Sequence, residues 1–334
     1  MQVPFTELAV KKLLAEAGLA GPHGPPSKLT GGNNQVFLIE GEDWRAVLKA
    51  YFHHPDDPRD RFGAETAFSR FLRAGGVNEV PELLSSDSEY RLALYQYVEG
   101  VRPDQVGGDD VSKAMEFIGR INKLRRAPEA ATLANGSEAC WSLEGHLDLV
   151  GSRLEQLRSA EHSVRAFIEE EAWPVWKRVR EWAGDRAGGI LAEVLRQERR
   201  CLSPSDFGFH NSLRDSGGNM FFLDFEYSGW DDPARMIADF FCQPEVLVPE
   251  DYMDAFADAV ADFDPAPDKM RARTEILLTV YRMKWCCISL NEFLPVGRAR
   301  RLGSATETGS EPGTDPARKL GQARQFLDLA ERRL

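Results

Sequence analysis

The chain has 334 residues, of which 43% are hydrophobic, and a formal net charge of −12. A chain of this length buries enough apolar surface for two domains or for one large two-lobed unit. The negative charge disfavours a nucleic-acid partner. No apolar stretch approaches the roughly 20 residues that cross a bilayer, so we expect no membrane partner.

The cysteines and the first residues indicate where the protein works. The five cysteines are odd in number and have no metal-binding spacing, which favours reduced thiols. The start of the chain lacks the basic and then apolar pattern of a secretory signal, so we expect a cytoplasmic protein. The acidic charge also mildly favours a cationic small molecule as partner, although acidic proteins are common in this compartment whatever they bind.

A glycine-rich turn, Gly31-Gly32-Asn33-Asn34, lies directly before the strand sequence QVFLI. Glycine lets backbone N–H groups approach phosphate oxygens closely, and asparagine tolerates the left-handed conformations that such turns use. An ordinary hairpin turn explains the same four residues without any ligand, so both interpretations stay open here. The sequence contains no GxxxxGK[ST] motif, so a P-loop nucleotide site is not supported.

The next strand and helix carry a lysine and a glutamate that we expect to pair. In RAVLKAYF, Lys49 lies on a strand with alternating faces. In the following helix, Glu65 lies three residues from both Phe62 and Phe68, and therefore on the apolar stripe. A buried carboxylate without a partner is costly, so the sequence predicts a Lys49–Glu65 ion pair. This pair has either a purely structural role or a role in binding phosphates.

From residue 110 onward the sequence predicts mainly helices. The apolar periodicity indicates helices over 110–126, 143–158, 162–182 with a kink at Pro174, and 189–200. The segment 303–316 is rich in Gly, Ser, Thr and Pro, and we expect a surface loop there before a last helix that begins near Ala317. A mixed first part followed by a helical second part indicates an α+β protein.

Three polar residues in LSPSDFGFHNSLRDSGGNMFFLDFEY have the spacing of a phosphoryl-transfer site. Asn211 lies five positions after Asp206, and Asp224 ends an apolar run of strand character thirteen positions later. A turn can therefore carry a general base and an amide toward an acid on the next strand. Because Mg²⁺ prefers oxygen ligands, we predict Asp206 as the catalytic residue and Asn211 and Asp224 as metal ligands. The alternative role of Asp206 is to cap a turn.

The triplet Asp206-Phe207-Gly208 has the letters of the metal-binding triplet of protein kinases, but the spacing argues against that role. No other asparagine of the chain has an aspartate five positions before it. Asp206 and Asn211 are therefore the base and the amide, and Asp224 takes the place of the metal-binding triplet's acid.

With these residues the chain resembles the aminoglycoside phosphotransferase and choline kinase-like family, small-molecule relatives of protein kinases, over residues 28 to 295. The family pattern is His-x-Asp, four residues, Asn, and then a strand that ends in Asp. Asp206, Asn211 and Asp224 match it, whereas Pro204 stands where the family has histidine. That histidine braces the loop, so we expect its replacement to act on loop geometry and rate more than on the chemistry.

The resemblance implies a two-lobed, protein-kinase-like α+β fold, with a nucleotide-binding lobe at 1–98 and a helical lobe at 99–334 that carries the catalytic loop and the acceptor site. It implies that Lys49 and Glu65 act on the α- and β-phosphates and that backbone groups near the end of a strand contact the base. Backbone contacts do not distinguish ATP from GTP. The predicted cofactor-binding residues are Gly31, Gly32, Asn33, Asn34, Lys49, Glu65, Gln96, Tyr97 and Val98.

We therefore expect an ATP- and Mg²⁺-dependent O-phosphotransferase that acts on a hydroxyl of a small molecule such as an aminoglycoside, an amino alcohol or a sugar. The alternative is a pseudokinase, a nucleotide-binding regulatory module with little or no activity. A protein kinase is less supported, because the chain passes from Asp224 to Asp232-Pro233 within eight residues, which leaves little room for a peptide-docking loop.

Further residues receive provisional roles. We expect Asp232 and Asp239 to cap and brace the segment after Asp224, and we give His210 no role in catalysis. Aromatic rings beside carboxylates would suit an ammonium group. The candidate acceptor-wall residues are Glu226, Trp230, Asp231, Trp285, Asn291 and Glu292.

Overall fold

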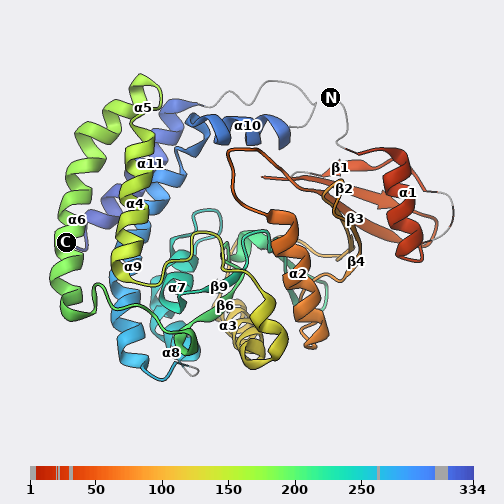
Figure 1. Ribbon diagram of the computed structural model, residues 1–334, viewed down its shortest axis with the longest axis horizontal. Helices are drawn as coiled ribbons and strands as arrows, with labels where there is room; N and C mark the ends of the chain where they lie inside the picture. The colour runs from red at the N-terminus through yellow and green to blue at the C-terminus, as the bar shows by residue number, and fades with distance from the viewer. Residues whose placement is uncertain (1–4, 20, 22, 30–32, 262–263, 305–314) are drawn as a thin grey trace.

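The computed structural model describes residues 5–19, 21, 23–29, 33–261, 264–304 and 315–334, which form two parts (Figure 1). Within these residues the first part is a five-stranded antiparallel sheet with the order β1-β2-β3-β5-β4. Its strands are β1 (Ser27–Leu29), β2 (Gln35–Glu40), β3 (Arg45–Ala50), β4 (Leu83–Asp87) and β5 (Leu92–Gln96). Gly31 and Gly32 lie outside the described residues.

Each face of this sheet packs against a helix. α1 (Glu7–Glu16) packs on the face that carries Leu48, where it forms an apolar cluster with β2, β3 and β5. α2 (Arg61–Ala74) lies on the other face, where Phe62 contacts the cluster around Val47. Because side chains alternate along a strand, β3 presents Leu48 to α1 and its neighbours in sequence to α2.

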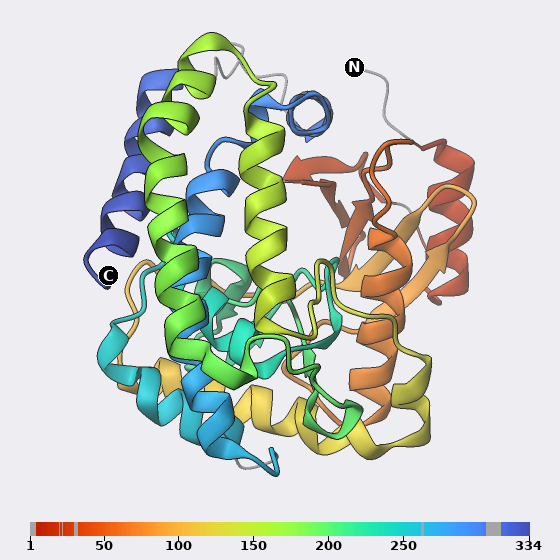
Figure 2. The same ribbon diagram turned by 60° about the vertical axis from the view of Figure 1, so that its left-hand side comes forward.

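The second part is mainly helical. Its helices are α3 (Gly108–Lys123), α4 (Leu143–Leu157), α5 (His162–Phe167), α6 (Trp173–Ala187), α7 (Pro233–Cys242), α8 (Met253–Ala261), α9 (Pro267–Ile288), α10 (Pro295–Ser304) and α11 (Pro316–Glu331). α9 is the central helix, because it packs against α4, α6, α7, α8 and α11 (Figure 2). Most of its side chains are buried, so it forms the core of this part.

Two short antiparallel strand pairs lie between the sheet and the helices (Figure 1). They are β6 (Cys201–Ser203) with β9 (Gly229–Asp231), and β7 (Ser212–Arg214) with β8 (Met220–Phe222). Asp206 and Asn211 lie in the connection from β6 to β7, and Asp224 follows β8. Asp206, Asn211 and Asp224 are thus positioned by the two short strand pairs, β6–β9 and β7–β8.

The long helix predicted over 162–182 is present, and its irregularity is a π-helical turn, Ile168–Ala172, that joins α5 to α6 directly before Pro174. Pro174 has no N–H group, so regular α-helical bonding cannot continue across it, and the wider turn absorbs the break.

The prediction of a helix over 189–200 is wrong. This segment, which the structure describes completely, contains only the 3₁₀ turns Gly188–Ile190 and Gln197–Arg199. Gly188 has a φ of +48° and ends α6. Leu195 N then donates to Trp141 O at 2.6 Å, so a tertiary hydrogen bond replaces helical bonding.

The two-lobed α+β fold is confirmed, and a last helix, α11, begins one residue before Ala317. Of the surface loop expected at 303–316, residues 305–314 lie outside the described residues. In both views α10 lies between the helical bundle and the end of the sheet (Figures 1 and 2). In the part of the chain that the structure describes, no helix has the length and apolar character needed to cross a membrane.

Candidate active site

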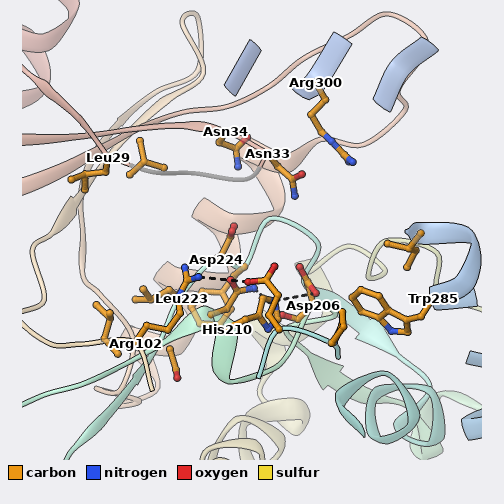
Figure 3. Close-up of a pocket in the computed structure, with 18 of the residues that line it drawn as sticks. Leu29, Asn33, Asn34, Arg102, Asp206, His210, Leu223, Asp224, Trp285 and Arg300 are labelled. Atoms are coloured by element: carbon orange, nitrogen blue, oxygen red, sulfur yellow. Dashed lines mark hydrogen bonds and ion pairs between the residues drawn. The ribbon is translucent and has the colours of Figure 1, made fainter. Parts of the chain in front are cut away.

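A cleft of about 1330 Å³ lies between the sheet and the helical part. Its walls come from β2, β3 and β5, from the loop between β6 and β7, and from α9, α10 and α11. Sites for one drug-sized ligand measure roughly 300–1,000 Å³, so this cleft has room for a nucleotide and a second small molecule. Figure 3 shows Asn33 on the sheet side of the cleft and Asp206, Asp224 and Trp285 on the opposite side.

Lys49 connects the sheet to the acid after β8. Its Nζ lies 2.5 Å from Glu65 Oε2 and 2.6 Å from Asp224 Oδ1, so the predicted Lys49–Glu65 ion pair is present. Burial acts to lower the pKa of Lys49, but the charges of Asp224 and Glu65 outweigh burial and hold that pKa well above its usual value. Burial raises the pKa of Glu65 to about 7 against the opposing charge of Lys49.

Asn33 and Asn34 fasten the end of the glycine-rich turn to the segment after β8. Asn33 Nδ2 donates to Glu226 Oε1 at 2.8 Å, and Asn34 Nδ2 donates to Glu226 Oε2 at 2.5 Å. Asn34 Oδ1 accepts from Phe52 N at 3.0 Å. Glu226 is therefore engaged with the turn and does not line the cleft as an acceptor-wall residue. The side-chain amides of Asn33 and Asn34 are therefore engaged by Glu226.

Ser205 takes over the bracing of the β6–β7 loop. It follows the buried Pro204 and has a φ of +67°, a conformation that only well-determined surroundings maintain in a non-glycine residue. Ser205 N donates to Ser203 Oγ at 2.9 Å, and Ser205 Oγ donates to Asp231 Oδ2 at 3.4 Å. Arg235 binds the same Asp231 carboxylate. Asp231 thus lies behind the loop rather than in the acceptor wall.

His210 lies beside Asp206 on the same loop. His210 Nε2 is 3.4 Å from Asp206 Oδ1 and 3.0 Å from Gln243 Nε2. A Cβ at Gly208 would lie 2.7 Å from His210 Nδ1, so glycine at this position leaves space for the imidazole ring. His210 received no role from the sequence, because only the folded loop brings its ring to the Asp206 carboxylate.

The pair of Asp206 and His210 favours the ionised carboxylate. Burial acts to raise the pKa of Asp206, but the hydrogen bond and charge of His210 outweigh burial and lower that pKa. Burial acts to lower the pKa of His210, and Asp206 raises it overall above its usual value. Asp206 is therefore a carboxylate at neutral pH that faces the cleft next to a readily protonated histidine.

Asn211 and Asp224 are suited to hold Mg²⁺. Asn211 Nδ2 donates to Asp206 O at 3.0 Å, which fixes the amide and directs Oδ1 away from that carbonyl. The Asp224 side chain is 35% exposed in the cleft and binds Lys49 through only one oxygen. The described residues contain no cluster of three or more His, Cys, Asp or Glu that could hold a metal alone. Two oxygen donors fit Mg²⁺, which takes its other ligands from phosphates and water.

Gln96, Tyr97 and Val98 line the cleft at the end of β5. The Gln96 N–H group is already used, because it donates to Glu82 O at 2.8 Å. The Tyr97 ring lies 4.2 Å from the Arg45 guanidinium carbon. Any contact of this segment with a base would therefore rely on backbone groups other than the Gln96 N–H.

The aspartates after Asp224 brace the helical part, as expected. Asp232 Oδ1 accepts from Ala234 N at 2.9 Å at the start of α7, and its other oxygen binds Arg273. Asp239 accepts from Lys284 Nζ at 2.9 Å and from Trp285 Nε1 at 2.7 Å. The second contact fixes the indole ring of Trp285 at the far end of the cleft.

Half of the candidate acceptor-wall residues line the cleft, namely Trp285, Asn291 and Glu292. Trp230 does not, because it is buried in the β6–β9 pair and its Nε1 donates to Ala130 O at 2.9 Å. Much of this wall comes from α10 and α11, which the sequence pattern did not select because their polar residues resemble an ordinary solvated helix face. The additional wall residues from these helices include Arg300, Arg318, Lys319, Gln322 and Gln325, and Arg332 follows at the end of α11.

A sequence comparison now identifies the family. The model of the phosphotransferase enzyme family matches residues 28–273. The chain belongs to this family. This assignment agrees with the placement of the phosphotransferase's Asp206, Asn211 and Asp224 around one cleft. No curated protein matches the chain by sequence.

Solved structures share the fold of this phosphotransferase. A choline/ethanolamine kinase family protein from Mesorhizobium loti is 19% identical, with a TM-score of 0.60 over 97% of this chain and 94% of the other. Choline kinase LicA from Streptococcus pneumoniae is 14% identical, with a TM-score of 0.58 over 97% and 100%. Spectinomycin phosphotransferase APH(9)-Ia is 12% identical, with a TM-score of 0.59 over 100% of both chains. At these identities the likeness shows the fold alone.

Proposed function

We propose that this phosphotransferase transfers the γ-phosphoryl group of ATP to a hydroxyl group of a small molecule and that it uses Mg²⁺. The observation that carries the proposal is the meeting of Asp206, Asn211 and Asp224 at one cleft, with Lys49 bound to Asp224. Two of the similar solved structures support a nucleotide of this kind, because LicA was solved with AMP and APH(9)-Ia with ADP and spectinomycin.

In the proposed reaction, the bond from the γ-phosphorus to the β–γ bridging oxygen breaks, and a bond to the acceptor oxygen forms while the acceptor hydroxyl loses its proton. Asp206 orients that hydroxyl and accepts its proton. Lys49, held by Glu65, binds the α- and β-phosphates. Mg²⁺ bound by Asn211 and Asp224 would neutralise charge on the phosphates. Most of the rate then comes from positioning and charge rather than from strong proton abstraction.

The nucleotide would lie against the first lobe, which we assign to residues 1–98, with the helical lobe at 99–334. The backbone of Gly31, Gly32, Asn33 and Asn34 would cover the phosphates, and the backbone of the segment Gln96 to Val98 would contact the base. These backbone contacts do not distinguish ATP from GTP, because neither segment uses a side chain that hydrogen-bonds to the edge of the base.

A pseudokinase is the second candidate, and it is less well supported. This candidate is suggested by Pro204, which replaces the histidine of the family pattern. Ser205 nevertheless holds the loop through its hydrogen bonds with Ser203 and Asp231. A module that only binds a nucleotide has no need of Asp206, whose carboxylate is kept ionised beside His210. The family assignment also favours an active enzyme.

The first test is thermal unfolding of the full chain with and without ATP and Mg²⁺, together with ADP formation in the presence of hydroxylated acceptors. We expect ATP with Mg²⁺ to raise the unfolding midpoint and at least one acceptor to stimulate ADP formation above the rate with water alone. If neither ATP nor GTP changes the midpoint, the nucleotide assignment is wrong. Stabilisation without stimulation by any acceptor would favour the pseudokinase.

A further inference from the structure

The acceptor end of the cleft is formed by the end of α9, by α10 and by α11. Figure 3 shows Arg300 extending from α10 into the same open space that Asn33, Asp206 and Trp285 border. Arg300 also lines an adjoining cavity together with Tyr227, whose hydroxyl lies 3.2 Å from Asn33 Nδ2. Arg300 therefore borders the same cleft as Asp206, from the side of α10.

A carboxylate of this end is already matched by a cation of the chain. Glu292 Oε1 lies 3.1 Å from Lys319 Nζ, and both side chains are mostly buried. A cationic acceptor such as the choline or ethanolamine of the similar kinases would have to compete with this ion pair for a counter-charge.

The unmatched charges of the acceptor end are mainly positive. Three arginines that line the cleft have no ion-pair partner among the residues that the structure describes, namely Arg300, Arg318 and Arg332. Asp328 is the one cleft-lining carboxylate of this end that likewise has no such partner among these residues. Arg300 is half-buried, while Arg318 and Arg332 are exposed. Solvent supplies the exposed arginines with counter-ions, but a half-buried guanidinium has less access to water and gains more from a bound anion.

We infer that the acceptor of this phosphotransferase carries an anionic group, a carboxylate or a phosphate, that binds Arg300 while its hydroxyl lies at Asp206. The planar guanidinium forms two parallel hydrogen bonds with either oxyanion, which fixes the orientation of the molecule as well as its charge. Arg300 would also offset the repulsion between the anionic acceptor and the nucleotide phosphates. The inference rests on the proposed function, because it concerns the substrate class of the same site.

The test compares acceptors that share a carbon skeleton and differ in charge. One set is glycerate, glycerol and 3-amino-1,2-propanediol, and the other is gluconate, glucose and glucosamine. Glycerol 3-phosphate separates a phosphate from a carboxylate as the preferred group. ADP formation is measured with the full chain at saturating ATP and Mg²⁺, and the unfolding midpoint is measured with each compound in the presence of Mg²⁺ and a non-hydrolysable ATP analogue.

We expect kcat/KM for an anionic member to exceed that of its neutral and cationic counterparts by about tenfold or more. Arg300→Gln should reduce this preference by a similar factor through KM for the acceptor, with KM for ATP unchanged. The matched control is Arg298→Gln, because Arg298 lies on the same helix but is exposed and is not among the residues that line the cleft. Arg298→Gln should retain the full preference.

Three outcomes would overturn the inference. The first is a preference for a neutral or cationic member, and the second is an Arg300→Gln variant that keeps the anionic preference or that raises KM for ATP instead. The third is that no anionic compound is turned over or raises the unfolding midpoint. Failure of the proposed function is a different result, in which ATP with Mg²⁺ does not stabilise the protein and no acceptor of any charge stimulates ADP formation.

Discussion

The two ends of the cleft differ in how their charges are matched. At the nucleotide end, Lys49 Nζ lies 2.5 Å from Glu65 Oε2 and 2.6 Å from Asp224 Oδ1, so each charge has a partner inside the chain. At the acceptor end, Arg300 has no ion-pair partner in the described part of the chain. Charged groups that take part in the same reaction step whatever the acceptor can be held in place by the protein before any substrate binds. Groups that select a substrate remain open until the substrate brings the opposite charge.

The largest expected effect comes from Asp206, which lies where the two ends meet. We expect Asp206→Asn to reduce acceptor-dependent ADP formation by about 10³-fold or more, because the amide cannot accept the hydroxyl proton. Binding of ATP with Mg²⁺ should change by less than about twofold, since the phosphates are held by other residues. Steady-state rates and a nucleotide titration by calorimetry measure the two quantities.

The control for this variant is Asp185→Asn, because Asp185 is exposed on α6 and lies outside the cleft. It should behave like the wild-type protein in both measurements. If Asp206→Asn loses nucleotide binding and folded structure together with turnover, the carboxylate has only a structural role and its assignment to the reaction fails.

The sequence was a better guide to the nucleotide end than to the acceptor end. Glu65 could be paired with Lys49 because a carboxylate on an apolar helix stripe requires a nearby cation, and both residues lie within one short stretch of chain. Asp206, Asn211 and Asp224 also lie close together in the chain, within the segment that contains the two short strand pairs β6–β9 and β7–β8. Local pattern therefore sufficed for these residues.

The acceptor end depends on contacts between distant segments, which a single sequence does not reveal. Glu226 was expected in the acceptor wall, but it binds Asn34, which is 192 residues earlier in the chain. Arg300 could not be selected because a helix with arginines on one side is usually a solvated surface helix. Its position at the cleft follows only from how α10 packs against the 3₁₀ turn Asn291–Phe293 that follows α9.

Asp224 tests whether the nucleotide end needs a metal. We expect Asp224→Asn to lower the affinity for ADP in the presence of Mg²⁺ by about 30-fold or more and to leave the weaker affinity without Mg²⁺ nearly unchanged. The physical reason is that the neutral amide is a poorer ligand for a hard cation than a carboxylate. Titrations of ADP with Mg²⁺ and with a chelator give both values. An undiminished difference between the two conditions would count against Asp224 as a metal ligand.

A smaller effect is expected at Glu65, which holds Lys49 in place. Glu65→Gln should raise KM for ATP by about tenfold with little change in kcat, because Lys49 loses one of its two anionic partners and its fixed position. Steady-state kinetics at varied ATP measure this change. Glu42→Gln is the control, since Glu42 is exposed in the same lobe and lies outside the cleft.

The pH dependence of KM for ATP sharpens this prediction. Burial raises the pKa of Glu65 to about 7, so its carboxylate gains a proton as the pH falls through that value. The attraction to Lys49 is then lost, and KM for ATP in the wild-type protein should rise as the pH falls from 8 to 6. Glu65→Gln should not show this rise. A pH dependence that is the same in both proteins would remove Glu65 as its origin.

The smallest expected effect on the maximal rate concerns His210, which links the Asp206 loop to α7 through Gln243. His210 lowers the pKa of Asp206, so its replacement by asparagine should move the acidic limb of the kcat/KM profile to higher pH. The rate on the alkaline side of that limb should fall by only about threefold, because Asp206 itself remains. Rates from pH 4 to pH 9 measure both changes.

Stability gives an independent readout of the same contact. The pKa of His210 is raised above its usual value in the folded protein, so the contact contributes its full stability below the pKa of the unfolded chain and loses it as the pH rises through the folded pKa. His210→Asn should therefore destabilise the protein more at pH 6 than at pH 9, as measured by urea unfolding. A destabilisation equal at both pH values, with an unmoved acidic limb, would mean that His210 only fills space above Gly208. The charge of Asp206 would then be set by the open cleft, and the loop would depend on Ser205 alone for its support.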